Sequence, residues 1–107
     1  MSDHDTTGWT FTDTNATPLQ ETPDGAKFKM IGAADGFVMV YSELAAGESG
    51  SPHEHGAPEF LYVLEGGLTS NGVEMKAGHG YAAAAGSKHT EFASTDGCKF
   101  VSVFKLG

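Results

Sequence analysis

The stretch GESGSPHEHGAPEFLYVLEG, from Gly47 to Gly66, is the most informative segment of this chain. It places His53, His55 and Glu59 at spacings of two and four residues. In an extended strand, residues at even spacing share one face, so the two imidazoles and the carboxylate are expected to converge. Converging nitrogen and oxygen donors are typical of a transition-metal site. The segment therefore predicts a metal site carried by a strand.

The composition indicates one globular domain that binds neither nucleic acid nor membranes. The chain has 107 residues, which leaves room for a single core, so we expect one domain over residues 1–107 with residues 1–7 as a disordered tail. The net charge of -8 argues against DNA, RNA and anionic membrane surfaces. Cys98 is the single cysteine, which excludes an internal disulfide and favours a reduced, cytoplasmic setting.

Short strands joined by tight turns account for most of the hydrophobic pattern. Asn71-Gly72, between Leu68–Ser70 and Val73–Lys76, is the strongest hairpin signal, because a type I′ turn needs positive φ at both central residues. Further strands are expected over residues 9–12, 28–31, 37–44, 59–65, 81–85, 89–93 and 99–106, with turns at residues 32–36 and at Gly66-Gly67. About eight to ten strands without a long helix predict an all-β sandwich or barrel.

The expected strand over residues 59–65 is apolar on both faces. Phe60, Tyr62 and Leu64 fall on one face, and Leu61 and Val63 fall on the other. A strand with two apolar faces is usually covered on both sides. We therefore expect the face away from the metal to pack against a second sheet or a second subunit, and the small size of the chain adds to the case for a homodimer.

His89 is a fourth candidate ligand, and it lies thirty residues after Glu59. It can reach the site only if the chain folds back, and Gly86 allows a tight turn just before it. Glu91 follows His89 at a spacing of two, so it is expected to face the same way. It could then serve as a general base beside the metal or as a hydrogen-bond acceptor for a ligand. A solvent-exposed carboxylate at the mouth of the barrel is the alternative.

These residues resemble the two sequence motifs of the cupin superfamily, which consists of small β-barrels of the jelly-roll type. The first motif is Gly, five residues, His-x-His, three or four residues, Glu, six residues and Gly. The chain matches it with Gly47, His53, His55, Glu59 and Gly66. The second motif is Gly, five residues, Pro-x-Gly, two residues, His, three residues and Asn. The chain has Gly78, Gly86 and His89 but carries Ala84 for the proline and Ala93 for the asparagine.

The resemblance implies a small jelly-roll barrel in which His53, His55, Glu59 and His89 bind one divalent transition metal ion. Four protein ligands leave two positions on a six-coordinate metal for water, substrate or O₂, which favours iron, manganese or nickel. A tetrahedral zinc would be saturated by the same four ligands, and copper also accepts imidazole and carboxylate. Residues 87–106 further resemble cupins related to the ChrR anti-sigma factor, a group that includes dioxygenases that cleave diketone-like carbon–carbon bonds.

The motifs and the resemblance together predict a metal-dependent enzyme. It would be a dioxygenase or a related Lewis-acid catalyst that acts on a small oxo or hydroxy compound. A metal-dependent isomerase, decarboxylase or lyase would use the same ligands. The alternative is a non-enzymatic cupin that senses a metal or a ligand and regulates a protein partner, as the anti-sigma relatives do.

Overall fold

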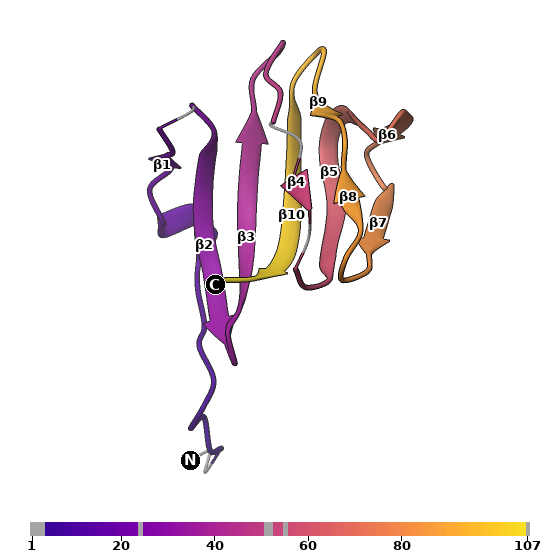
Figure 1. Cartoon of the computed structure of the whole chain (residues 1–107). Helices are drawn as coiled ribbons and strands as arrows, with labels where there is room; N and C mark the ends of the chain where they lie inside the picture. Colours follow the sequence, from indigo (N-terminus) through magenta and orange to yellow (C-terminus); the bar gives the residue numbers. More distant parts are fainter. Residues whose placement is uncertain (1–3, 24, 51–52, 55, 107) are drawn as a thin grey trace.

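Strands form nearly all of the regular structure in the computed structural model, which describes residues 4–23, 25–50, 53–54 and 56–106 (Figure 1). The elements are η1 (Thr14–Ala16), β1 (Gln20–Glu21), β2 (Lys27–Ala34), β3 (Phe37–Leu44), β4 (His53–Glu54), β5 (Glu59–Ser70), β6 (Val73–Lys76), β7 (Gly80–Ala83), β8 (Lys88–His89), β9 (Phe92–Ala93) and β10 (Cys98–Lys105). The predicted all-β class is confirmed. Part of the expected tail, residues 1–3, lies outside the described residues.

One curled antiparallel sheet carries most of these strands, in the order β1-β2-β3-β10-β5-β6 (Figure 1). The long strand β5 joins its parts, because its first half pairs with β7 and its last residues pair with β6 and β9. The two-stranded ribbon β4–β8 lies over the main sheet (Figure 1). Strand β5 therefore connects the main sheet to the smaller strands around the ribbon that holds His53 and His89.

Strand β5 changes its pairing partners near Gly66. Before this residue it pairs with β7, and after it β5 pairs with β6 and β9. The expected turn at Gly66-Gly67 is wrong, because β5 continues through both glycines to Ser70. Gly66 has φ of 76°, and a Cβ atom there would lie 2.2 Å from the carbonyl oxygen of Gly97. A backbone in the left-handed region with another backbone this close requires glycine. The glycine pair thus permits a bend within a continuous strand rather than a chain reversal.

The hairpin turns follow the local sequence. Asn71 and Gly72 have φ of 49° and 80°, and Ser70 pairs with Val73, so the predicted hairpin is confirmed. The expected turn over residues 32–36 is shorter than predicted, because β2 continues to Ala34 past an irregularity between Met30 and Gly32. Asp35 and Gly36 then make the reversal, with φ of 52° and 83°.

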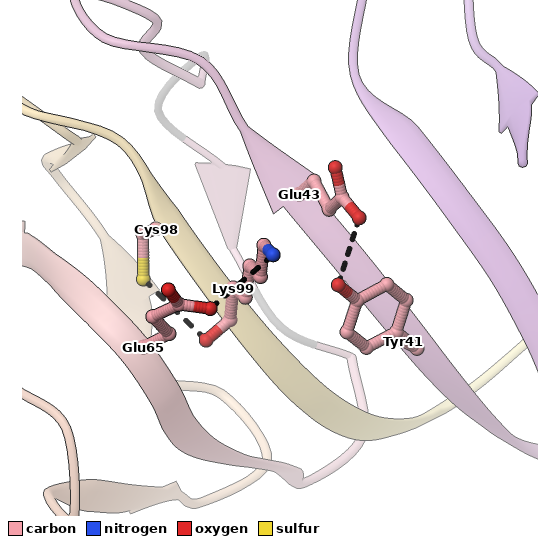
Figure 2. Close-up of polar contacts among 5 residues, drawn as sticks. All are labelled: Tyr41, Glu43, Glu65, Cys98 and Lys99. Atoms are coloured by element: carbon pink, nitrogen blue, oxygen red, sulfur yellow. Dashed lines mark hydrogen bonds and ion pairs between the residues drawn. The ribbon is translucent and has the colours of Figure 1, made fainter.

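The core lies on the concave side of the main sheet. Its buried cluster consists of Leu61, Val63, Leu68, Met75, Cys98 and Phe100. Burial raises the pKa of the Cys98 thiol, which therefore behaves as a small apolar residue. Lys99 points to the other side of the sheet, where its Nζ lies 3.2 Å from a carboxylate oxygen of Glu65 (Figure 2).

The other face of β5 is largely exposed in the part of the chain that the structure describes. Phe60, Tyr62 and Leu64 are 48%, 52% and 46% exposed, whereas Leu61 and Val63 are buried. The predicted alternation is confirmed, but among the described residues no second sheet covers this face, and covering by a second subunit remains a prediction. The convex side of the sheet therefore presents large apolar side chains to solvent.

The expected strand over residues 9–12 is wrong. No strand forms there, and Trp9 and Phe11 stack on each other with ring centroids 6.1 Å apart while both remain exposed. Alternating aromatic and threonine side chains favour a strand only when a neighbouring edge pairs with the segment, and no such pairing forms at residues 9–12. Across the described ranges, no helix is long and apolar enough to span a membrane.

Candidate metal centre

His89 ends the short strand β8 and lies in a buried aromatic environment. Its side chain is 6% exposed, and its ring packs edge-on against Phe92 with centroids 4.9 Å apart. The Nε2 atom of His89 lies 3.0 Å from the hydroxyl oxygen of Ser70. A histidine that binds a metal through one ring nitrogen usually makes a hydrogen bond through the other. Ser70 is such an orienting partner, and the sequence patterns did not point to it.

Glu59 begins β5 and is connected to His89 through Tyr81. The Tyr81 hydroxyl donates a hydrogen bond to Oε1 of Glu59 at 3.3 Å, and the Tyr81 ring packs edge-on to the His89 ring at 6.1 Å. Tyr81 lies on β7 in register with Leu61, two residues from Glu59. Burial, followed by the negative charge of Glu59, raises the pKa of Tyr81 well above its usual value. Tyr81 therefore remains a hydrogen-bond donor to the carboxylate.

The backbone register of β4 and β8 brings two of the four expected ligands together. His53 pairs directly with His89 in the antiparallel ladder, next to the pair Glu54 and Lys88. The side chain of His53 and the whole of His55 lie outside the described residues. Within the described residues, no group of three His, Cys, Asp or Glu side chains is gathered in a way that could hold a metal. The donor types nevertheless suit a divalent transition metal, because His89 supplies a buried imidazole and Glu59 a half-buried carboxylate.

Asn71 holds the segment on both sides of His89. Its side-chain nitrogen donates to the carbonyl oxygen of Lys88 at 2.8 Å, and its Oδ1 accepts from the backbone N–H groups of Thr90 and Glu91 at 2.7 Å and 3.1 Å. The tip of the β5–β6 hairpin is thereby attached to the residues that flank the candidate ligand. Asn71 is thus a positioning residue for His89, in addition to its role in the turn.

Glu91 does not share the orientation predicted from its spacing to His89. Strand β8 ends at His89, so the alternation of faces does not extend to Glu91. Glu91 is exposed, and its Oε1 accepts a hydrogen bond from the Gly72 N–H at 2.8 Å. The carboxylate therefore supports the hairpin turn, which corresponds to the alternative of a solvent-exposed residue.

The location of Glu91 predicts a structural rather than a catalytic effect. Replacing Glu91 with glutamine is expected to lower the free energy of unfolding by about 1 kcal/mol or less, because a neutral acceptor retains part of this hydrogen bond. Metal content and turnover should stay at the wild-type level. Urea denaturation and elemental analysis of the same preparation would check both points. A loss of turnover at unchanged stability would restore Glu91 as a general base.

A cavity of about 470 Å³ adjoins the candidate centre. Its lining includes Ser70, Met75, His79, Tyr81, Lys88 and His89. His79 lies in the bend between β6 and β7, and its Nδ1 accepts a hydrogen bond from the Lys76 backbone N–H at 3.0 Å. The cavity is large enough for a small organic molecule, and it reaches the candidate ligand His89 together with Ser70 and Tyr81.

The half-buried phenols of Tyr41 and Tyr81 predict a specific dependence of stability on pH. Burial and the Glu43 carboxylate raise the pKa of Tyr41 to about 12, and the pKa of Tyr81 is also raised above the usual 10.0. Because the unfolded chain loses these protons first, the stabilisation is complete below pH 10 and is lost as the pH rises through the folded-state values. The free energy of unfolding should therefore be lower at about pH 11 than at about pH 9.

This dependence can be measured by urea denaturation at the two pH values. The Tyr81→Phe variant lacks one of the two phenols. Its free energy of unfolding should therefore change less between the two pH values than that of the wild type. A wild-type free energy of unfolding that is unchanged between the two values would contradict the assigned environments of Tyr41 and Tyr81.

Comparisons with known proteins agree with this architecture. A family model described as the ChrR cupin-like domain matches residues 7–105. The pectin degradation protein KdgF of Dickeya dadantii (strain 3937) is 28% identical over 93 residues, which cover 82% of this chain and 84% of that protein. The crystal structure of an acetylacetone dioxygenase from Acinetobacter johnsonii superimposes with a TM-score of 0.78 at 14% identity, covering 98% of this chain and 78% of the other.

A third match is the structure of an anti-sigma factor in a complex. The anti-sigma factor ChrR, in its complex with SigE of Rhodobacter sphaeroides, matches with a TM-score of 0.76 at 14% identity, over 87% of this chain and 52% of that chain. At such identities, the two structural matches demonstrate a common fold only. They confirm the predicted cupin barrel.

Proposed function

Because this chain belongs to the family of ChrR cupin-like domains, we propose that it is a metal-dependent enzyme that acts on a small oxo or hydroxy compound, most simply as a dioxygenase. The observation that carries the proposal is a set of pairwise relations among the described residues. His53 pairs with His89 across the β4–β8 ladder, and Tyr81 connects His89 to Glu59.

The proposed ligands are His53, His55, Glu59 and His89. When bound, a divalent iron, manganese or nickel ion would supply Lewis acidity toward two oxygen atoms of a substrate. The chain itself supplies the orientation of the ligands. Ser70 contacts a ring nitrogen of His89, and the protonated Tyr81 hydroxyl holds one oxygen of the Glu59 carboxylate.

The neighbouring cavity supports a small substrate. Its volume of about 470 Å³ has room for a small organic compound, and Met75 and Tyr81 provide apolar surface beside the polar Ser70. The acetylacetone dioxygenase with the same fold makes small β-dicarbonyl compounds the first substrates to test.

Oxygen uptake provides the test. Protein reconstituted with iron(II), manganese(II) or nickel(II) would be supplied with acetylacetone and related β-dicarbonyl compounds in an oxygen electrode. The proposal predicts oxygen consumption that requires both the metal and the substrate, with loss of the dicarbonyl absorbance. Conversion of a compound without oxygen consumption would indicate a Lewis-acid isomerase, decarboxylase or lyase instead. Fragments of pectin belong in the same panel because of the similarity to KdgF.

A sensor is the second candidate, and the match to the ChrR cupin-like family is the observation that favours it. Such a protein would bind a metal or a ligand at the same residues and regulate a protein partner. Stoichiometric binding of one partner, together with an absence of turnover on every compound in the panel, would support the sensor over the enzyme.

A further inference from the structure

The bend between β6 and β7 places an imidazole at the edge of the cavity beside the candidate centre. Strands β6, β7 and β8 lie together at one edge of the molecule (Figure 1), and residues from all three line the cavity of about 470 Å³. The bend residue His79 lines it as well. Because His89 is buried and His79 is exposed, these two imidazoles mark the inner and the outer part of the cavity.

Hydrogen bonds within the bend hold the His79 ring in place. The backbone N–H of Lys76 donates to Nδ1 of His79 at 3.0 Å, and the backbone N–H of His79 donates to the Lys76 carbonyl oxygen at 2.9 Å. The bend is also attached to β5, because the His79 carbonyl oxygen accepts from the Val63 N–H and the Gly78 N–H donates to the Val63 carbonyl oxygen, both at 2.9 Å. A ring that is already fixed loses little conformational freedom when it binds a ligand.

The hydrogen bond from Lys76 also determines which ring nitrogen of His79 carries the proton. A backbone N–H can only donate, so Nδ1 is an acceptor and the proton of the neutral imidazole resides on Nε2. Among the described residues, Nε2 of His79 has no hydrogen-bond partner. The Nε2–H group is therefore a fixed donor at the cavity, and it suits an oxygen acceptor on a bound molecule rather than another donor such as an ammonium group.

The rest of the lining does not provide a comparable specific contact at this end of the cavity. Met75 and Tyr81 supply apolar surface for the body of a ligand. Glu74 and Lys88 carry opposite charges, so the charged residues of the lining do not favour one sign over the other. In a mostly apolar cavity, a small number of fixed polar groups determines the orientation of the ligand. At the outer part, His79 has this role.

We propose that His79 is a specificity-determining residue whose Nε2–H binds an oxygen atom of the substrate at the end that points away from the metal. The inference rests on the proposed function, in which two oxygen atoms of a β-dicarbonyl compound face the metal. It narrows the substrate class to β-dicarbonyl compounds that carry a further oxygen acceptor, such as a carboxylate, at the end of the chain. A site that donates a hydrogen bond to a substrate discriminates against an analogue that lacks the acceptor.

Succinylacetone and butyrylacetone form a matched pair of probes, because they share a carbon skeleton and a β-dicarbonyl group and differ only in a terminal carboxylate or methyl group. Anaerobic titration calorimetry would measure the binding of both to the metal-reconstituted protein. The wild type should bind succinylacetone about tenfold more tightly than butyrylacetone. Equal affinities would overturn the role of His79 and leave the proposed function intact. If neither probe binds, the proposed function is contradicted, and this inference with it.

Two substitutions of His79 separate ligand binding from the support of the bend. His79→Asn keeps an acceptor near the position of Nδ1 for the Lys76 N–H but has no atom at the position of Nε2, whereas His79→Gln places an amide nitrogen near Nε2 and lacks the Nδ1 acceptor. His79→Asn should lose the preference for succinylacetone and keep its affinity for butyrylacetone, while His79→Gln should retain most of the preference. A wild-type preference in His79→Asn would show that His79 only closes the bend.

Nuclear magnetic resonance of isotope-labelled imidazole nitrogens gives a readout that does not depend on activity. The signals of His79 are identified by their absence from the His79→Asn spectrum, and the spectrum distinguishes the two tautomers directly. The wild type should carry the His79 proton on Nε2, and this signal should shift when succinylacetone is added but not when butyrylacetone is added. A proton on Nδ1, or an Nε2–H signal that succinylacetone leaves unchanged, would overturn the proposal. Elemental analysis would establish that both variants retain the metal.

Discussion

Replacing His89 is expected to abolish metal binding and turnover together. The residue is buried, lies opposite His53 across the β4–β8 ladder and is oriented by Ser70 and Asn71. Losing even a hydrogen-bond partner of a ligand lowers metal affinity by about 10- to 100-fold, so the loss of a ligand itself should exceed that range. Reconstituted His89→Gln protein should therefore contain little metal and show no turnover.

Two features of the experiment separate coordination from folding. Glutamine preserves much of the volume of the imidazole, so the variant avoids the cavity that alanine would leave in the aromatic environment of Phe92 and Tyr81. His79→Gln is the matched control, because His79 borders the same cavity but bonds to the backbone of Lys76. It should keep the metal. Circular dichroism would establish that both variants are folded, and a His89→Gln variant that retains wild-type metal content would show that His89 is not a ligand.

Replacing Gly66 with alanine is expected to cause the largest loss of stability of any conservative substitution in the main sheet. The added methyl group would meet the Gly97 carbonyl oxygen at 2.2 Å. This neighbour is backbone: its oxygen accepts a hydrogen bond from the Gly67 N–H, and the next residue, Cys98, pairs with Gly66. The residue would also have to adopt a left-handed conformation that costs about 1–2 kcal/mol. Overpacking adds about 1–3 kcal/mol, so the free energy of unfolding should fall by about 2–5 kcal/mol.

Gly72→Ala isolates the conformational part of this loss. Gly72 has φ of 80°, close to that of Gly66, but a Cβ atom at Gly72 would have no neighbour within 4 Å. Urea denaturation should show a loss of only about 1–2 kcal/mol for this variant. Equal losses for Gly66→Ala and Gly72→Ala would mean that the close approach of Gly97 does not determine the path of β5.

Local sequence signals predicted the parts of the fold that depend on local chemistry. The strand over residues 37–44, the turn at Asn71-Gly72 and the strand over residues 73–76 that follows it were predicted with their observed bounds, because alternation and turn chemistry are properties of neighbouring residues. Gly66-Gly67 was predicted as a turn because the constraint on it comes from Gly97, thirty-one residues later and on another segment of the chain. The missing strand at residues 9–12 has a similar cause. Its pattern is strand-like, but whether a strand forms depends on an edge elsewhere in the chain, and none pairs with this segment.

For the candidate centre too, the sequence pointed to some residues and not to others. Its ligands were identified by their residue types and spacing, and these remain a prediction. The residues that orient them were not found, because Ser70, Asn71 and Tyr81 reach the ligands or their neighbours across 17 to 22 residues of chain through the closure of the barrel. The orientation expected for Glu91 extended strand alternation beyond the end of β8, where it no longer applies, and the catalytic role of Glu91 remains a prediction.

The metal content of the wild-type protein is the measurement that tests this account most directly. The protein would be purified without added metal or chelator, analysed for transition metals, and analysed again after anaerobic reconstitution with iron(II), manganese(II) or nickel(II). The account predicts close to one ion per chain, with two coordination positions that are open to small oxygen ligands. A protein that binds no transition metal in either preparation would contradict the proposed centre and the enzymatic function that depends on it.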